Sequence, residues 1–363
     1  MCVYGLTRHS ANISGKYINF VLDEMPLLNY NVSMSKSKVQ NRSTKNDPVI
    51  QELPIACANE KAAVEFIEKQ RWGDHPACPR CGDMNVYKMV DSKTGERQKN
   101  FRWRCRGCKE QFTVRIGTVF EDSRIELRHW CFSFWRASTS KKGVSALEIH
   151  RQTGVSYKSA LFMLHRIRYA MAPETASRGP LTGTVEVDEV YLGGKPRRHH
   201  RGPAGNAKVK QPVIALVERG GDVRTRAVAS VNSKNLRETI HNNVSIRARL
   251  MTDEFPMYRK IGKKYADHQV VKHSAYEYVR GDAHVNSCES FFALLRRGLH
   301  GIYHSVSKKH LDMYLAHAAF LYNHRELEDG ERVIAAIQAS DGKRMVYKAC
   351  QNAKTHISLP EPI

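Results

Sequence analysis

Long apolar runs are missing from this 363-residue sequence, and acidic side chains are scarce beside basic ones. No stretch reaches the roughly 18 consecutive apolar residues that a membrane-spanning helix needs, which excludes an integral membrane protein. The first residues also lack the charged-then-apolar order of a secretory signal. We therefore expect a cytoplasmic protein with no membrane partner.

The shortage of acidic residues points to the class of partner. Lysine and arginine number 58 against 36 aspartates and glutamates, so the formal net charge is +22. An excess of this size favours a polyanion, and nucleic acid before a membrane surface. On charge alone, a basic protein without a nucleic-acid partner stays an alternative.

Disulfides are not expected for the nine cysteines of an intracellular chain. Four of them, however, have a spacing that is typical of a metal site. Cys78 and Cys81 lie in CPRCG, and Cys105 and Cys108 lie in CRGC. Two such pairs, joined by a hairpin, predict a closed tetrahedral site for one structural zinc ion. Four buried structural thiols are the alternative, although they would not need two CxxC pairs. We assign residues 60–118 to this zinc ribbon.

The segments around the ribbon predict a polar leader and a DNA-binding hairpin of helices. Residues 1–50 are rich in Ser, Asn and Lys and are expected to be disordered. Within residues 120–175, a helix from about Ser145, a break at Gly154 and a helix over Tyr157–Met171 are typical of a helix-turn-helix. Candidate DNA contacts are Lys158 and Arg166 in the second helix and Arg102 and Arg104 in the ribbon. A helical hairpin and a solvated basic face without DNA are the alternatives.

The pattern changes to strands after a Pro/Gly linker. Three β-rich segments, a helix at about residues 234–243 and a further strand predict a mixed α/β domain on one sheet over residues 182–330. A basic loop between the first two strands carries Arg197 and Arg198, which either contact DNA or are simply solvated. Residues 331–363 are expected to form a C-terminal tail.

Carboxylates in the first predicted strand, TVEVDEVYLGG, need an explanation. Strand alternation places Glu186 and Asp188 on one face and Glu189 on the other. Asp253 ends another predicted strand, and Glu289 lies on an amphipathic helix. Buried carboxylates are costly unless cations neutralise them, and two magnesium or manganese ions could do so. The bland alternative for each acid alone is a solvated side chain.

Specific motifs give the sequence a family resemblance. The ribbon, the helical hairpin, VEVDEVYLGGK, MTDEFPMY and the long segment HVNSCESFFALLRRGLHGIYHSVSKKHL…YNHR follow one another in order. This order resembles the insertion-sequence DDE transposases with an N-terminal zinc ribbon, the fifteen-ninety-five family. The resemblance implies a ribonuclease-H-like catalytic domain with Asp188, Asp253 and Glu289 as the catalytic acids that bind magnesium or manganese. Asn286, one helical turn before Glu289, is the alternate third position.

The expected protein is thus multidomain: a zinc ribbon, an α-helical helix-turn-helix segment and an α/β catalytic domain. The resemblance implies a DNA transposase that binds the terminal inverted repeats of its element, cleaves the DNA and transfers the strand to target DNA. Arg296 and Arg297, in the motif after Glu289, are further candidate DNA contacts. A homo-oligomer on double-stranded DNA ends is expected. Glu186 and Glu189 have no motif support, so alanine there should have milder effects. A DNA-binding regulator without activity and a metal-dependent nuclease of the same fold are the alternatives.

Overall fold

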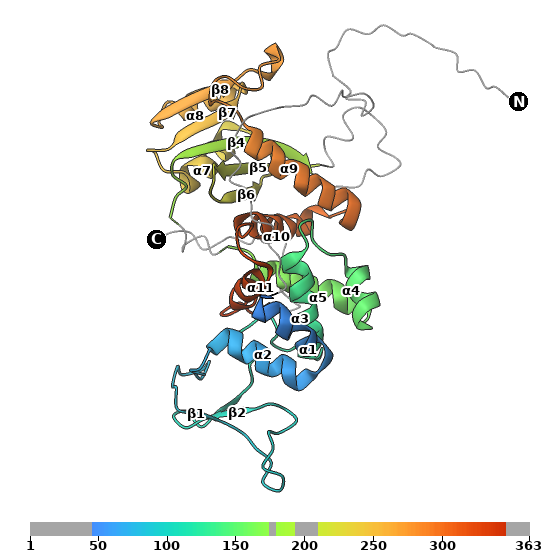
Figure 1. Ribbon diagram of the computed structural model, residues 1–363. Helices are drawn as coiled ribbons and strands as arrows, with labels where there is room; N and C mark the ends of the chain where they lie inside the picture. Colours follow the sequence, from blue (N-terminus) through green and yellow to red (C-terminus); the bar gives the residue numbers. More distant parts are fainter. Residues whose placement is uncertain (1–45, 174–178, 193–209, 346–363) are drawn as a thin grey trace, which may run out of the picture. The chain divides into compact units, whose positions relative to one another are not determined.

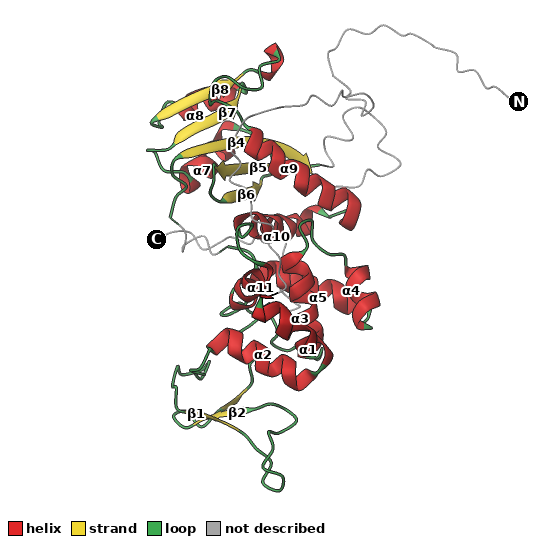
Figure 2. Cartoon of the chain, viewed as in Figure 1, coloured by secondary structure: helices red, strands yellow, loops and turns green. Residues whose placement is uncertain are grey.

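A computed structural model describes residues 46–173, 179–192 and 210–345 of the chain. Figure 1 follows the chain from the N-terminal helices through a small ribbon to a larger sheet, and Figure 2 separates helices from strands. Most of the expected leader, and Arg197 and Arg198, lie outside the described residues. Residues 48–50, which we had assigned to the leader, instead begin helix α1 (Pro48–Ala58).

Six helices make up most of one hydrophobic core, to which Phe320 of a seventh helix also contributes. Its largest buried side chains include Phe66, Trp130 and Phe134, and Val333 and Ile337 complete it from the C-terminal side. The helices are α1, α2 (Glu60–Trp72), α3 (Leu127–Thr139), α4 (Ala146–Thr153), α5 (Tyr157–Ala170) and α11 (Asp329–Gln338).

Helix α11 corrects the expected C-terminal tail. Residues 331–338 are helical, and Val333, Ala336 and Ile337 are buried against the other helices of the core. Burial of apolar side chains stabilises this helix. The first residues of the expected tail, 331–338, are therefore part of the folded core. Residues 346–363 lie outside the described part.

Capping residues fix the helical hairpin of α4 and α5. The side chain of Ser145 accepts the backbone N–H of Glu148, and that of Ser156 accepts the N–H of Ser159. Between them, Gly154 ends α4 with a left-handed φ of 74°, a conformation that glycine adopts at little cost. The expected hairpin is therefore present, with helix bounds close to those predicted.

The zinc ribbon is inserted between α2 and α3. Its antiparallel strands are β1 (Val86–Lys88), β2 (Trp103–Cys105) and β3 (Gln111–Phe112). Helix α2, which we had included in the ribbon, packs in the helical core and holds the ribbon by Glu68. The Glu68 carboxylate accepts hydrogen bonds from Trp103 Nε1 at 2.7 Å and from Arg97 Nη1 at 2.9 Å.

A five-stranded mixed sheet is the central element of the remaining described chain. Strand order is β6–β5–β4–β7–β8, in which β4 pairs antiparallel with β5 and parallel with β7. The strands and their smaller helices are β4 (Thr184–Leu192), β5 (Gln211–Glu218), β6 (Val223–Ala227), α7 (Ser233–Asn243), β7 (Arg249–Asp253), α8 (Pro256–Gly262) and β8 (Asp267–Val271). The expected mixed sheet is present.

Helices cover both faces of this sheet (Figure 2). Helices α9 (Asn286–Gly298) and α10 (Leu311–Asn323) pack on one face, where Val213, Ala215 and Val217 are buried. Helices α7 and α8 pack on the other face, against Val185 and Val187. Alternate residues of β4 therefore serve two cores, as strand geometry requires. No helix of the described residues is long and apolar enough to cross a membrane.

Helix α10 also contacts the helical core through a buried basic cluster. Arg168 of α5 is 1% exposed and lies over the ring of Tyr314, with 4.0 Å between its Cζ and the ring centroid. Buried His317 of α10 donates its Nε2–H to the carbonyl oxygen of Ala137 at 2.8 Å. Burial, helped by Arg168, lowers the pKa of His317 to about 4, and the same causes together with His310 lower that of His165 to about 4.

This cluster predicts a loss of stability in mild acid. The unfolded chain takes up a proton on His317 below about pH 6.5, whereas the folded chain resists protonation until about pH 4. The unfolded state thus binds more protons, and the free energy of unfolding falls as pH falls through this window. Replacing His317 by Gln keeps a donor for Ala137 and removes the titration. Between pH 7 and 5, wild type should lose about 2 kcal/mol more than His317→Gln in urea unfolding. Equal losses would contradict the assignment.

Candidate functional site

The four predicted cysteines converge on one point. All four sulfur atoms lie within 4.8 Å of one another, with 3.7 Å between the Sγ atoms of Cys78 and Cys108 and 3.6 Å between those of Cys81 and Cys105. A zinc ion bound tetrahedrally at about 2.3 Å from each sulfur sets sulfur–sulfur edges of about 3.8 Å. The cluster therefore fits a structural zinc ion. No second group of three or more such ligands converges as tightly within the described part of the chain.

The ribbon separates an apolar inner face from a basic outer face. Trp103 and Cys105 of β2 point inward and pack with Phe112 and Trp72. Arg102 and Arg104 alternate with them; Arg102 is exposed and Arg104 is half-buried. Both arginines thus lie on the face that the sequence predicted, where a polyanion could reach them.

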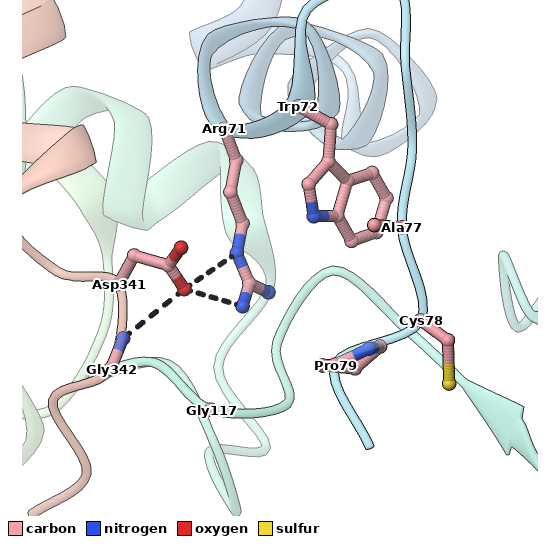
Figure 3. A pocket seen from close by; sticks show the side chains of 8 residues that line it. All are labelled: Arg71, Trp72, Ala77, Cys78, Pro79, Gly117, Asp341 and Gly342. Carbon is pink, nitrogen blue, oxygen red and sulfur yellow. Dashed lines mark hydrogen bonds and ion pairs between the residues drawn. The ribbon is translucent and has the colours of Figure 1, made fainter. Parts of the chain in front are cut away.

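A cleft beside the ribbon is structural in character. It is lined by α2, by the chain around Cys78 and by residues 341–342 (Figure 3). Within it, Arg71 donates to Asp341 Oδ1 from Nη2 at 2.6 Å and from Nε at 3.1 Å, and Nη1 donates to the carbonyl oxygen of Val114. These groups bond one another and tie α2 and the chain after β3 to the C-terminal segment, so we do not assign a ligand to this cleft.

The two aspartates lie side by side where the pairing of two parallel strands stops: Asp253 ends β7, and Asp188 is in the middle of the longer strand β4. Val187 of β4 is paired with Thr252 of β7, so the next residues, Asp188 and Asp253, stand at the same level on the same face. Asp188 accepts one backbone N–H, that of Glu189 at 2.7 Å, and Asp253 accepts that of Phe255 at 3.1 Å. The predicted pairing of these acids is therefore realised by sheet register.

Burial and like charge act together on these acids. Burial raises the pKa of Asp188 to about 6, with further contributions from Asp253 and Glu289, and burial raises the pKa of Asp253 as well. Carboxylates in such surroundings favour either protons or cations. Their environment suits the binding of hard divalent ions.

Helix α9 carries the third acid toward Asp188. Glu289 is exposed in the first turn of α9, and its charge is close enough to raise the pKa of Asp188. Asn286 is the first residue of the same helix and is also exposed. The choice between Glu289 and Asn286 as third ligand stays a prediction.

Glu186 has a structural role that its place in the sequence does not reveal. Its side chain is fully buried and accepts the backbone N–H groups of Ser287 at 2.7 Å and Cys288 at 3.1 Å, as well as Ser287 Oγ at 3.0 Å. These N–H groups belong to the first turn of α9, whose own N-cap residue, Val285, gives no side-chain cap. A strand carboxylate therefore caps the helix that carries Glu289.

Arg219 completes this clamp. Its Nε donates to Glu186 at 2.7 Å, while its Nη1 and Nη2 donate to the carbonyl oxygens of Asp282 and His284 at 2.7 and 2.9 Å. The loop before α9 and the first turn of α9 are thus both fixed to β4. The expectation of a milder effect for alanine at Glu186 concerns activity and stays a prediction; the contacts with Arg219, Ser287 and Cys288 add a structural role that comes from residues 33 to 102 positions away.

Glu189 lies on the opposite face, as strand alternation predicts. Its carboxylate accepts a hydrogen bond from the hydroxyl of buried Tyr258 in α8. Burial raises the pKa of Glu189 to about 7. It belongs to the packing of α8 rather than to the face that carries Asp188.

Candidate DNA contacts divide into exposed and buried residues. Lys158, Arg296 and Arg297 are exposed, as a role on DNA requires. Arg166 is 4% exposed, and its Nη1 donates to the carbonyl oxygens of Val119 and Glu121 at 2.7 and 2.8 Å. The assignment of Arg166 to DNA is therefore wrong: this guanidinium binds backbone carbonyls inside the helical core.

Comparison with known proteins identifies the family. Residues 58–111 match the model of the transposase zinc-ribbon domain, and residues 180–323 match that of the ISXO2-like transposase domain. A protein in transposable element ISH50 of Halobacterium salinarum is 30% identical over 281 residues, which cover 72% of this chain and 91% of that protein. The chain belongs to the family of ISXO2-like transposases with a zinc-ribbon domain. In this transposase, the first match includes all four cysteines and the second includes Asp188, Asp253 and Glu289.

The zinc site of the transposase gives a direct test. Cys105→Ser removes one of four ligands, so purified protein should hold less than one zinc ion per chain by elemental analysis. Cys57→Ser, a cysteine of the helical core, is the matched control and should keep one zinc ion. A Cys105→Ser protein with its full zinc content would contradict the site.

The clamp on α9 predicts a large effect on stability at Glu186, which is not one of the three expected catalytic acids. Glu186→Ala leaves Arg219 and the first turn of α9 without their partner, which should lower the free energy of unfolding by about 3 kcal/mol. Glu238→Ala breaks only the exposed ion pair with Arg226 and should cost under about 1 kcal/mol. Similar urea-unfolding midpoints for the two variants would refute the clamp.

Proposed function

We propose that the chain is a DNA transposase that binds the terminal inverted repeats of its element and catalyses DNA cleavage and strand transfer by two-metal-ion phosphoryl transfer. The observation that carries the proposal is the pair Asp188 and Asp253, level with each other on adjacent parallel strands, with Glu289 near Asp188 on α9. The order and direction of the five strands support the ribonuclease-H-like fold that the family resemblance implies.

The chemistry of the acids supports two ions rather than one. An in-line displacement at a phosphodiester is served by two ions about 3.5–4 Å apart, one for the attacking and one for the leaving oxygen, and three carboxylates are enough to hold such a pair. Asp188, Asp253 and Glu289 would hold magnesium or manganese. Such ions activate the attacking oxygen and stabilise the leaving oxygen of a phosphodiester. The residues supply hard oxygen ligands on rigid elements and place them in one register.

Basic side chains outside this centre support the binding of double-stranded DNA. Lys158 lies in the exposed first turn of α5, the part of a recognition helix that faces base edges in helix-turn-helix proteins. Arg102 and Arg104 on the ribbon, and Arg296 and Arg297 at the end of α9, would contact phosphates. We infer a homo-oligomer on the DNA, because joining both ends of an element to a target requires two active sites.

The alternatives differ from this proposal in what the acids do. A DNA-binding regulator would not need Glu289 near the pair of aspartates, and the free-energy cost of burying Asp188 beside Asp253 has no use in a scaffold. A metal-dependent nuclease of the same fold would cleave DNA but would not join the 3′-hydroxyl to a target. Strand transfer into a plasmid separates the proposed transposase from such a nuclease.

The acids give the test of mechanism. Alanine at Asp188, Asp253 or Glu289 should lower cleavage and strand transfer about a thousandfold or more, since loss of one ligand costs several kcal/mol at about 1.4 kcal/mol per tenfold in rate. Binding to the repeats should persist, because the ribbon and the α4–α5 hairpin precede residue 180. Rates come from strand-transfer assays, and affinities from gel shifts.

Controls make this test specific. Glu238→Ala, on the exposed side of α7, should keep wild-type rates. Asn286→Ala tests the competing third ligand. If Asn286→Ala is inactive while Glu289→Ala stays active, Asn286 and not Glu289 is the third ligand. Three active alanine variants at the acids would reject the mechanism.

A further inference from the structure

The loop between β8 and α9 exposes large apolar and aromatic side chains to solvent. Tyr276 is 85% exposed, Tyr278 is 49% exposed and Val279 is 47% exposed. In Figure 1, the orange segment that follows β8 extends beyond the edge of the sheet. Apolar groups gathered on an exposed loop are typical of a binding surface rather than of packing.

This loop begins beside the catalytic acids. Val271 of β8 is paired with Asp253 of β7, and the loop starts at the next residue. Glu254, which follows Asp253, accepts the backbone N–H of Ser274 at 3.0 Å and its hydroxyl at 2.7 Å. The loop is therefore held next to the end of β7, where the proposed function places the scissile phosphate.

Hydrogen bonds close the loop and present Tyr276 at its turn. The N–H of Tyr276 donates to the carbonyl oxygen of His273 at 3.0 Å, and Arg280 and Ala283 exchange backbone hydrogen bonds of 3.0 Å. The backbone of Tyr276 is left-handed, with φ 55° and ψ 22°. Glycine or asparagine usually occupies such a position, so a tyrosine there indicates a use for its ring.

Charge and shape favour a nucleic-acid base as the occupant. Exposed Lys272 and half-exposed His273 flank the tyrosines, and an aromatic ring beside basic groups is the common platform for unpaired bases. Inside a duplex both faces of each base are covered by neighbours and a terminal pair offers only its outer face, whereas an unpaired base is free to stack on the ring. Such a base occurs at a DNA end or at a locally opened pair.

We propose that Tyr276 stacks on an unpaired base of the DNA end beside the scissile phosphate and so holds the strand against the acids. The proposal rests on the proposed function, because it needs DNA at this edge of the sheet. It assigns Tyr276 a DNA contact that acts on strand position and not on duplex recognition.

The test uses the full chain without divalent ions and two DNA probes. One probe is a blunt 20-base-pair duplex, and the other is the same duplex with a three-nucleotide 3′ overhang that contains 2-aminopurine. Stacking quenches the fluorescence of this base. Tyr276→Ala should remove the quenching and weaken overhang binding about tenfold, with blunt-duplex affinity unchanged. Tyr276→Phe, which keeps the ring, should behave as wild type, and Ile246→Ala, an exposed apolar residue of another loop, is the control.

Each other result has a distinct meaning. If Tyr276→Ala keeps both the quenching and the overhang affinity, the proposal is overturned while the proposed function stands. If wild type binds neither probe, the DNA binding in the proposed function fails first. If the variant loses self-association of the DNA-free protein in sedimentation, and not overhang affinity, the loop contacts a second copy of the chain and the stacking role is wrong.

Discussion

The carboxylate of Glu186 joins β4 to the N-terminus of α9, and the geometry of the acidic centre depends on this contact. Asp188 is two residues further along the same strand, and Glu289 lies in the first turn of the same helix. The interaction of Glu186 with Ser287, Cys288 and Arg219 therefore fixes the strand and the helix in one register. Without it, the position of α9 on the sheet would depend on apolar packing and on the weak hydrogen bond from the Cys288 thiol to the carbonyl oxygen of Glu186, which resist sliding less well.

Comparison of Glu186 with its neighbours separates structural from functional burial. Glu186 receives two backbone N–H groups, a hydroxyl and a guanidinium, so its charge is compensated by the protein. Asp188 and Asp253 accept one backbone N–H each from flanking residues. The pKa of each is raised, chiefly by burial. The fold thus compensates the buried negative charge of Glu186 but not, to the same degree, the charges of Asp188 and Asp253. Cations are the natural compensation for these two.

The sequence allowed prediction of whatever depends on local spacing. Two CxxC pairs predicted the cysteine cluster, Ser145 and Gly154 predicted the hairpin bounds, and alternation placed Glu186 and Glu189 on opposite faces. Prediction failed where distant contacts decide. Arg166 on an amphipathic helix looks like a DNA contact until the carbonyls of Val119 and Glu121 are placed around it. The polar stretch before Val333 likewise gives no sign of the core that α11 completes.

The parallel and the antiparallel strands of the mixed sheet have different roles at the acidic site. Strands β4, β7 and β8 run parallel, so their carboxyl ends meet at one edge, and ligands commonly bind at such edges. Asp253 and the loop that starts after Val271 lie at this edge because of strand direction, and Asp188, in the middle of β4, is level with Asp253 because the β4–β7 pairing stops at Val187 and Thr252. The antiparallel strands β5 and β6 bring no acid to that edge and instead supply packing surface for α9 and α10. Parallel pairing therefore concentrates the charged groups at one point, while antiparallel pairing provides the rigid support that buried charge requires.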